Sequence, residues 1–197
     1  MSSDAERHLI YKAANTPLQF YPFPHFYAEG VFPTDFYAEL QQNLPDPSEL
    51  TSLAETGRVP AGAYKERFFF PLKREQLERL PEHKRVFWQQ LKQWLVVGEF
   101  GRVMREKFGQ LISHRFRGNP GVQFYEEAML VKDATNYSLG PHTDSQQKVI
   151  TFLFYLPKDE SQRHLGTSIY LPKQREFRCP VLSGMWLEFG VARSPAA

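Results

Sequence analysis

A histidine and an aspartate two positions apart, His142 and Asp144, have the types and the spacing that could do chemistry. In an extended backbone, side chains at positions i and i+2 point to the same face, so this imidazole and this carboxylate can reach one point in space. A neutral imidazole and a carboxylate belong to the three-ligand set that holds non-haem Fe(II) and leaves the other coordination positions open. The pair therefore predicts a candidate iron site.

The same triplet also has an ordinary structural interpretation. In that interpretation His142 is a turn histidine, and Asp144 accepts a backbone hydrogen bond in an Asx-turn after Gly140 and Pro141. A His-x-Asp triplet arises by chance in about one in five chains of this length and composition, so by itself it is a weak signal. The surrounding sequence has to discriminate between the two interpretations.

The elements that must position the pair divide into a helical first part and a β-rich second part. Apolar residues recur at helical spacing between residues 87 and 112. Gly98 and Gly101 each cost about 1 kcal/mol against alanine inside a helix, so one helix and two helices both remain open here. After the turn signal at 118–121, β-branched and aromatic residues concentrate in three runs, at 122–132, 148–156 and 167–171. Helices followed by strands predict an α+β fold.

Three segments near the N-terminus complete this layout. The proline- and aromatic-rich segment 17–33 is expected to be an extended edge strand. Thr34 is expected to cap a short helix that ends before Pro45. Residues 50–64, small, polar and rich in glycine, are expected to form a surface loop that could cover a site.

Length and composition exclude several classes of protein. At 197 residues and 23.0 kDa the chain fits one domain, 1–197, with its own core. Cys179 is the only cysteine, which excludes an intramolecular disulfide and a CxxC redox pair and favours a reducing, cytoplasmic setting. The first residues are polar and include acids, unlike an export signal, and no apolar run approaches the length that spans a bilayer.

Charge gives no support for a nucleic-acid or membrane partner. The chain carries 24 basic and 22 acidic residues, a net charge of +2, so no strong electrostatic attraction to polyanions is expected. The basic cluster at 114–117 is interpreted as a solvated helix end. No nucleic-acid or membrane partner is therefore expected.

The stretch 137–157, followed by 166–170, resembles the prolyl-hydroxylase-like branch of the Fe(II)/2-oxoglutarate-dependent oxygenases. Residues 23–27 and 31–44 also resemble the opening of bacterial members, so the similarity covers most of 20–178. It implies a double-stranded β-helix, a cupin-like jelly roll, with residues 1–120 as a helical support region and 121–178 as the first part of the β-helix.

The resemblance also implies an activity, namely hydroxylation by a dioxygenase that uses Fe(II), 2-oxoglutarate and O2. His142 and Asp144 match the first two iron ligands of the family. Tyr155 matches a tyrosine that hydrogen-bonds the distal carboxylate of 2-oxoglutarate, and Thr151, on the same strand face, could line the same pocket. For Tyr155 and Thr151 the alternative is core filling in a buried strand.

The resemblance ends before the family's pattern is complete. Family members continue with a distal histidine and then an Arg or Lys that pairs with the cosubstrate, whereas His164, the sole histidine after His142, lies too close to it along the chain. Residues 179–197 match nothing in the family, so a truncated or frame-altered tail and a β-helix incomplete at its C-terminus are expected. Glu188 as third ligand and Arg193 as carboxylate clamp are the alternative. Without a third ligand the chain could be inactive, and a catalytically dead β-helix that acts as a binding or structural module is the rival hypothesis.

Overall fold

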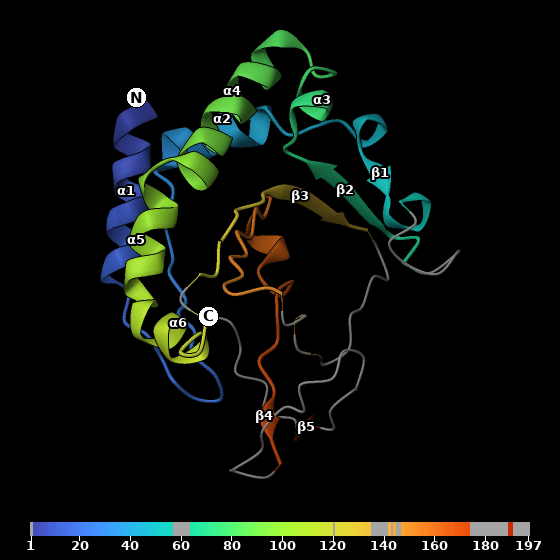
Figure 1. Cartoon of the computed structure of the whole chain (residues 1–197). Helices are drawn as coiled ribbons and strands as arrows, with labels where there is room; N and C mark the ends of the chain where they lie inside the picture. Colours follow the sequence, from blue (N-terminus) through green and yellow to red (C-terminus); the bar gives the residue numbers. More distant parts are fainter. Residues whose placement is uncertain are drawn as a thin grey trace. The chain divides into compact units, whose positions relative to one another are not determined.

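The computed structural model describes residues 2–56, 64–119, 121–134, 142, 144, 147–173 and 189–190. Within these ranges helices are combined with small antiparallel sheets (Figure 1), in keeping with the mixed α and β fold predicted from the sequence. The chain divides into two compact units. The first comprises residues 1–16 and 27–137, and the second comprises residues 17–26 and 138–197.

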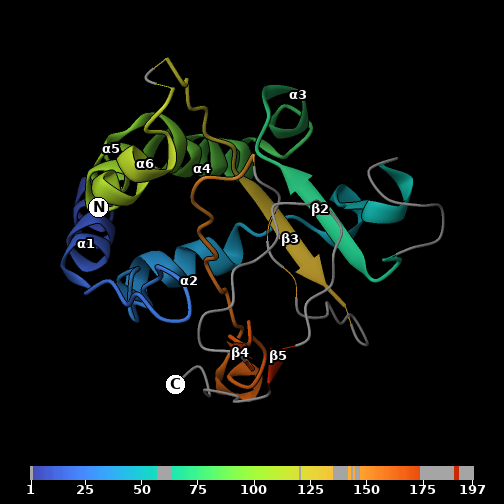
Figure 2. The ribbon, with the colours of Figure 1, turned by 60° about the horizontal axis from the view of Figure 1, so that its bottom comes forward.

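Helices make up most of the first unit, and Figure 2 shows them from a second direction. The N-terminal helix packs against α5 and buries Ala5, Leu9 and Ala13, which recur every four residues along one face. Lys107, at the end of α5, donates to the carbonyl oxygens of Ala14 at 2.8 Å and Thr16 at 2.5 Å. The α-helices are α1 (Ser2–Asn15), α2 (Thr34–Gln42), α3 (Arg74–Leu77), α4 (Glu82–Lys92), α5 (Glu99–Lys107) and α6 (Gly109–Arg115).

The long helical region is broken at Gly98, between α4 and α5, and again at Phe108, between α5 and α6. A π-helical turn, η3 (Gln93–Val97), follows α4, and the Gly98 N–H donates to the Gln93 carbonyl at 2.7 Å. Gly98 then adopts an extended conformation, with φ −83° and ψ −160°, and α5 starts at the next residue. Of the two arrangements left open by the sequence, the broken one is confirmed, and Gly101 lies inside α5.

A three-stranded antiparallel sheet with the order β1-β2-β3 completes the first unit. Its strands are β1 (Thr51–Ser52), β2 (Arg67–Pro71) and β3 (Met129–Asp133). Arg67 lies directly opposite Asp133, and its guanidinium donates from Nε at 2.6 Å and from Nη2 at 2.8 Å to the two carboxylate oxygens. This bidentate pair fixes the register at the end of the β2–β3 ladder.

The core of the first unit is aromatic. The ring of Phe36 from α2 lies 5.6 Å from Phe87 and 5.1 Å from Trp94, measured between centroids. Trp88 is fully buried, and its indole N–H donates to the Asn43 carbonyl at 2.7 Å.

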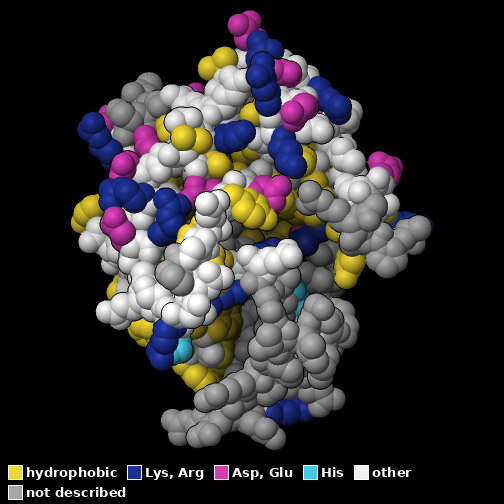
Figure 3. Space-filling model, in the orientation of Figure 1, with side chains coloured by type: hydrophobic (Ala, Val, Ile, Leu, Met, Phe, Trp, Pro, Cys, Tyr) yellow, Lys and Arg dark blue, Asp and Glu magenta, His cyan; other side chains and the backbone are white. Residues whose placement is uncertain are grey.

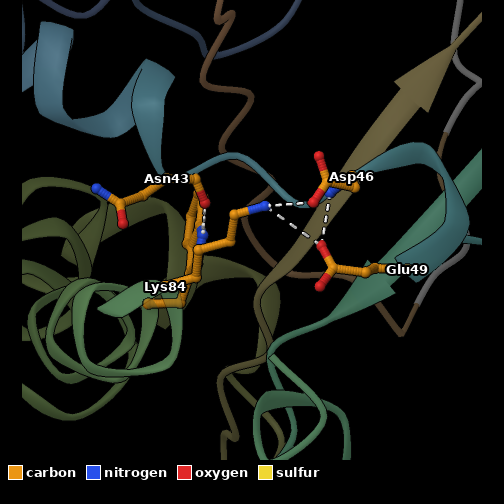
Figure 4. A network of polar contacts seen from close by, with 5 residues as sticks. Asn43, Asp46, Glu49 and Lys84 are labelled. Carbon is orange, nitrogen blue, oxygen red and sulfur yellow. Dashed lines mark hydrogen bonds and ion pairs between the residues drawn. The ribbon is translucent and has the colours of Figure 1, made fainter. Parts of the chain in front are cut away.

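One buried cation ties α4 to the segment that follows α2. Figure 4 shows Lys84 of α4 reaching Asp46 and Glu49, which lie before and at the end of the short 3₁₀ turn η1 (Pro47–Glu49). The lysine Nζ lies 2.7 Å from Asp46 Oδ2 and 3.5 Å from Glu49 Oε2. The Asp46 N–H in turn donates to Glu49 Oε2 at 2.6 Å, so the turn holds both carboxylates toward the ammonium.

Several expectations about the N-terminal segments are wrong. Residues 17–33 form no edge strand but make a single isolated bridge, Gln19 to His25, because the prolines of this segment supply no N–H donors for a ladder. Pro33, not Thr34, is the N-cap of α2, and Thr34 is its first helical residue; the helix does end before Pro45 as expected. The segment 50–64 contains β1 and the 3₁₀ turn η2 (Leu53–Glu55), and residues 57–63 lie outside the described residues.

The expected strands are shorter than the β-rich runs. Of the run 122–132 only the last four residues belong to β3, and described residues of the run 148–156 belong to no assigned strand. In the third run, 167–171, only Leu171 lies in a strand. This strand, β4 (Leu171–Pro172), pairs antiparallel with β5 (Phe189–Gly190). Among the described residues, none of the helices has the length and apolarity needed to cross a membrane.

Candidate metal centre

The second unit carries His142 and Asp144, both exposed to solvent. An electrostatic interaction with His142 is the smallest of the influences that lower the pKa of Asp144. Residue 143 between them and residues 145–146 lie outside the described residues. The convergence of the imidazole and the carboxylate on one metal ion stays a prediction.

Two other side chains hold the Asp144 carboxylate, one at each oxygen. Lys148 Nζ donates to Oδ1 at 2.8 Å, and Thr151 Oγ1 donates to Oδ2 at 2.8 Å. The aspartate side chain is 39% exposed. Because each carboxylate oxygen has two lone pairs, each can accept a further partner besides its present donor.

The pKa of Asp144 is lowered from its ordinary value by these neighbours. Partial burial acts in the opposite direction and is the largest single influence. The hydrogen bonds from Lys148 and Thr151, together with the positive charges of Lys148 and His142, outweigh it. Asp144 is therefore an anion at neutral pH, which is the form that a cation requires.

The segment after Asp144 alternates between two faces. Phe152, Phe154 and Leu156 are half-buried, whereas Thr151, Leu153 and Tyr155 are exposed. This is the period of two that an extended backbone imposes. Thr151 and Tyr155 therefore share one face, and neither fills a core in the part of the chain that the structure describes.

Tyr155 extends the exposed face toward a second segment of the same unit. Its hydroxyl donates to Thr167 Oγ1. Thr167 follows Gly166, which leads out of the loop that contains η4 (Glu160–Gln162). The polar groups along this face thus run from the Asp144 carboxylate through Thr151 to the Tyr155 and Thr167 hydroxyls.

The sequence did not predict two residues of this candidate site, Lys148 and Thr167. Lys148 lies four residues after Asp144 with the opposite charge, a spacing that could have suggested their contact. Thr167 carries no sequence signal for its role, because the hydrogen bond with Tyr155 depends on how the intervening loop folds. Thr151 contacts the Asp144 carboxylate, and its place in a cosubstrate pocket stays a prediction.

His142 and Asp144 supply two side chains of the types that a ferrous ion binds. Within the described ranges, no group of three or more His, Cys, Asp or Glu side chains could hold a metal ion. His164 is exposed. Glu188 and Arg193, the alternative ligand and clamp, lie outside the described residues, as do Cys179 and the rest of the C-terminal tail except residues 189–190.

The first unit contains a hollow of about 570 Å³. It fits an anion or a metal ion less well than the centre at Asp144 does. Its two arginines are already paired with acids: Arg102 with Glu99 and Glu106, and Arg105 with Glu126. On the face seen in Figure 3, Lys and Arg side chains are likewise interspersed with Asp and Glu. The hollow therefore offers no unpaired arginine to an anion, and its described side chains include no group of three or more metal ligands, so the centre at Asp144 is the stronger candidate.

Comparison of this chain with protein-family models, with curated proteins and with solved structures found no match.

Proposed function

We propose that this chain is an Fe(II)- and 2-oxoglutarate-dependent dioxygenase domain that hydroxylates a small-molecule or peptidyl substrate. One observation carries the proposal: an aspartate two positions from a histidine has hydrogen bonds at both carboxylate oxygens, on a unit whose next extended segment presents hydroxyl groups on a single exposed face. This is the ligand chemistry of non-haem iron, next to groups that can donate to a carboxylate cosubstrate.

The proposal also assigns a fold to the second unit. We infer a double-stranded β-helix in which the half-buried phenylalanines of 152–156 face the interior of the roll and Thr151, Leu153 and Tyr155 face the site. The two-stranded pair of β4 and β5 is compatible with such a roll. The support for this assignment is the alternating exposure of the segment.

Each residue of the site then has a defined task. His142 Nε2 or Nδ1 and an Asp144 oxygen would hold the metal, and Thr151 would keep the carboxylate in place. Tyr155 would turn its hydroxyl from Thr167 to the distal carboxylate of 2-oxoglutarate. When bound, the ferrous ion and 2-oxoglutarate supply the oxidising power that places one oxygen atom of O2 into a substrate C–H bond. Leu153, which is 61% exposed between the two hydroxyl-bearing residues, offers an apolar wall.

A β-helix that binds a ligand without catalysis is the second candidate. It is favoured by the composition of the metal centre, because the described residues contribute two ligands to it and not three. In this alternative the exposed face of 151–155 would bind a polar ligand through the same hydroxyl groups.

Anaerobic titration of the full chain with Fe(II) and 2-oxoglutarate separates the two candidates. A dioxygenase should develop the weak visible charge-transfer band of iron chelated by 2-oxoglutarate, and His142→Ala or Asp144→Ala should abolish it. His164→Ala is the matched control, since it removes another exposed histidine of the same unit and should leave the band intact. A chain that folds but shows no band in any form would exclude the dioxygenase.

A further inference from the structure

We propose that two neighbours of Asp144 have opposite effects on cation binding: Thr151 fixes the carboxylate for the metal, and Lys148 is a built-in counter-ion that competes with the metal. This inference rests on the proposed function, because it takes Asp144 as a metal ligand. It assigns Thr151 a positioning role and assigns Lys148 a role that opposes metal binding.

The geometry separates the two neighbours. They contact different oxygens of one carboxylate, Lys148 at Oδ1 and Thr151 at Oδ2, each at 2.8 Å. A monodentate metal ligand uses one oxygen, so the other can keep its hydrogen bond while the metal is bound. A cation at Oδ1 would meet the Lys148 ammonium directly, whereas the neutral hydroxyl at Oδ2 can keep its hydrogen bond.

Because the two donors differ in charge, their expected effects on cation affinity have opposite signs. The Thr151 hydroxyl is neutral, so it restrains the carboxylate without repelling a cation, as partners that orient metal ligands do. The Lys148 ammonium is positive, so a divalent cation at Oδ1 would face a like charge within a few ångströms. Lys148 is 55% exposed and can swing into solvent, which makes it a displaceable occupant.

The two effects differ in size. An exposed ion pair such as Lys148–Asp144 is weak, so its removal should tighten metal binding by about two- to fivefold. Loss of a partner that orients a ligand typically weakens metal binding by about 10- to 100-fold, and this is the loss expected for Thr151.

Mn(II) affinity of the full chain tests the inference without any turnover. We would measure the free-ion signal by electron paramagnetic resonance in wild type, Lys148→Met, Thr151→Val and Thr151→Ser, with folding checked by circular dichroism. Lys148→Met should bind more tightly than wild type, Thr151→Val should bind more weakly, and Thr151→Ser, which keeps the hydroxyl, should recover the wild-type affinity. Because salt screens exposed charges, the advantage of Lys148→Met should shrink as ionic strength rises.

Matched controls come from the same unit. Lys158→Met removes an exposed positive charge and Ser161→Ala removes a hydroxyl that donates to Asp159, and neither residue donates to Asp144 in the described structure. Both controls should bind Mn(II) like wild type. Suppose that wild type binds Mn(II) and His142→Ala abolishes the binding, but Lys148→Met and Thr151→Val leave the affinity unchanged. That result would overturn this inference alone. No binding by wild type would overturn the proposed function and the inference with it.

Discussion

Lys84 Nζ lies 2.7 Å from Asp46 Oδ2, although the lysine side chain is only 9% exposed. Glu49 is the second partner, at 3.5 Å and 20% exposed, so the ammonium is removed from water and compensated by two acids (Figure 4). A buried charge of this kind is stable only while its partners are present. The contact therefore ties α4 to the turn that follows α2.

Lys84→Met should destabilise the chain by about 1–2 kcal/mol, because it keeps the apolar stem but leaves Glu49 without its cation. Urea denaturation followed by circular dichroism would measure the loss. Lys73→Met is the control: its pair with Glu127 spans 4.0 Å and the lysine is 58% exposed, so it should cost less than about 0.5 kcal/mol. Equal effects of the two substitutions would contradict the buried role of Lys84.

The same lysine predicts a dependence of stability on alkaline pH. The hydrogen bond to Asp46 raises the pKa of Lys84; burial opposes this, and the charges of Glu49 and Asp46 add to it. Because the pKa is higher in the folded state than in the unfolded state, the contribution to stability is complete below the ordinary lysine value of 10.5 and is lost as pH rises through the folded value. The difference in unfolding free energy between wild type and Lys84→Met should therefore shrink above about pH 10.5. A difference that stays constant to higher pH would contradict the raised pKa.

Gly101 and Glu126 should show non-additive effects on stability. A Cβ built on Gly101 would lie 2.5 Å from Glu126 Oε1, and that carboxylate is the partner of Arg105. Gly101→Ala should gain up to about 1 kcal/mol of helix propensity and lose a similar amount by displacing the ion pair, so its net effect should be small. In a Glu126→Ala background the same substitution should stabilise by about 1 kcal/mol. A double-mutant cycle by thermal unfolding measures this coupling, and strict additivity would refute it.

Tyr155→Phe tests the role proposed for the tyrosine hydroxyl. If this hydroxyl donates to the distal carboxylate of 2-oxoglutarate, its removal should weaken 2-oxoglutarate binding about tenfold or more and leave Mn(II) binding unchanged. Calorimetric titration of the chain with Mn(II), followed by titration of the Mn(II)-loaded chain with 2-oxoglutarate, measures the two affinities. Thr167→Val breaks the same hydrogen bond but keeps the tyrosine hydroxyl, so it should affect the affinity far less. Equal losses in the two variants would point to positioning of the ring and not to donation.

The local parts of the candidate site could be predicted from the sequence. Spacing of two residues predicts that His142 and Asp144 lie close together, and the same period predicts that Thr151 and Tyr155 share a face. The contacts of Asp144 could not be predicted in the same way, because the Thr151 contact depends on how the chain turns between residues 144 and 151. The iron, the cosubstrate and the β-helix stay predictions that the binding experiments address.

The fold was predictable where one residue type dominates the local conformation. Pro45 limits α2, and Gly98 is where the long helical region breaks. The helix α1 was not expected, because its buried face consists of the small residues Ala5 and Ala13 around Leu9 within a polar sequence. The strand β2 was also missed: its three consecutive phenylalanines, 68–70, give no alternation of polar and apolar residues.

The two-faced segment 151–156 also restricts how the length of the chain can vary there. Deleting Phe152 would turn the side chain of Tyr155 toward the apolar side and would bring Phe154 and Leu156 out to solvent. Ligand contacts and solubility would then fail together. Insertions and deletions in this segment should therefore be tolerated only in steps of two residues.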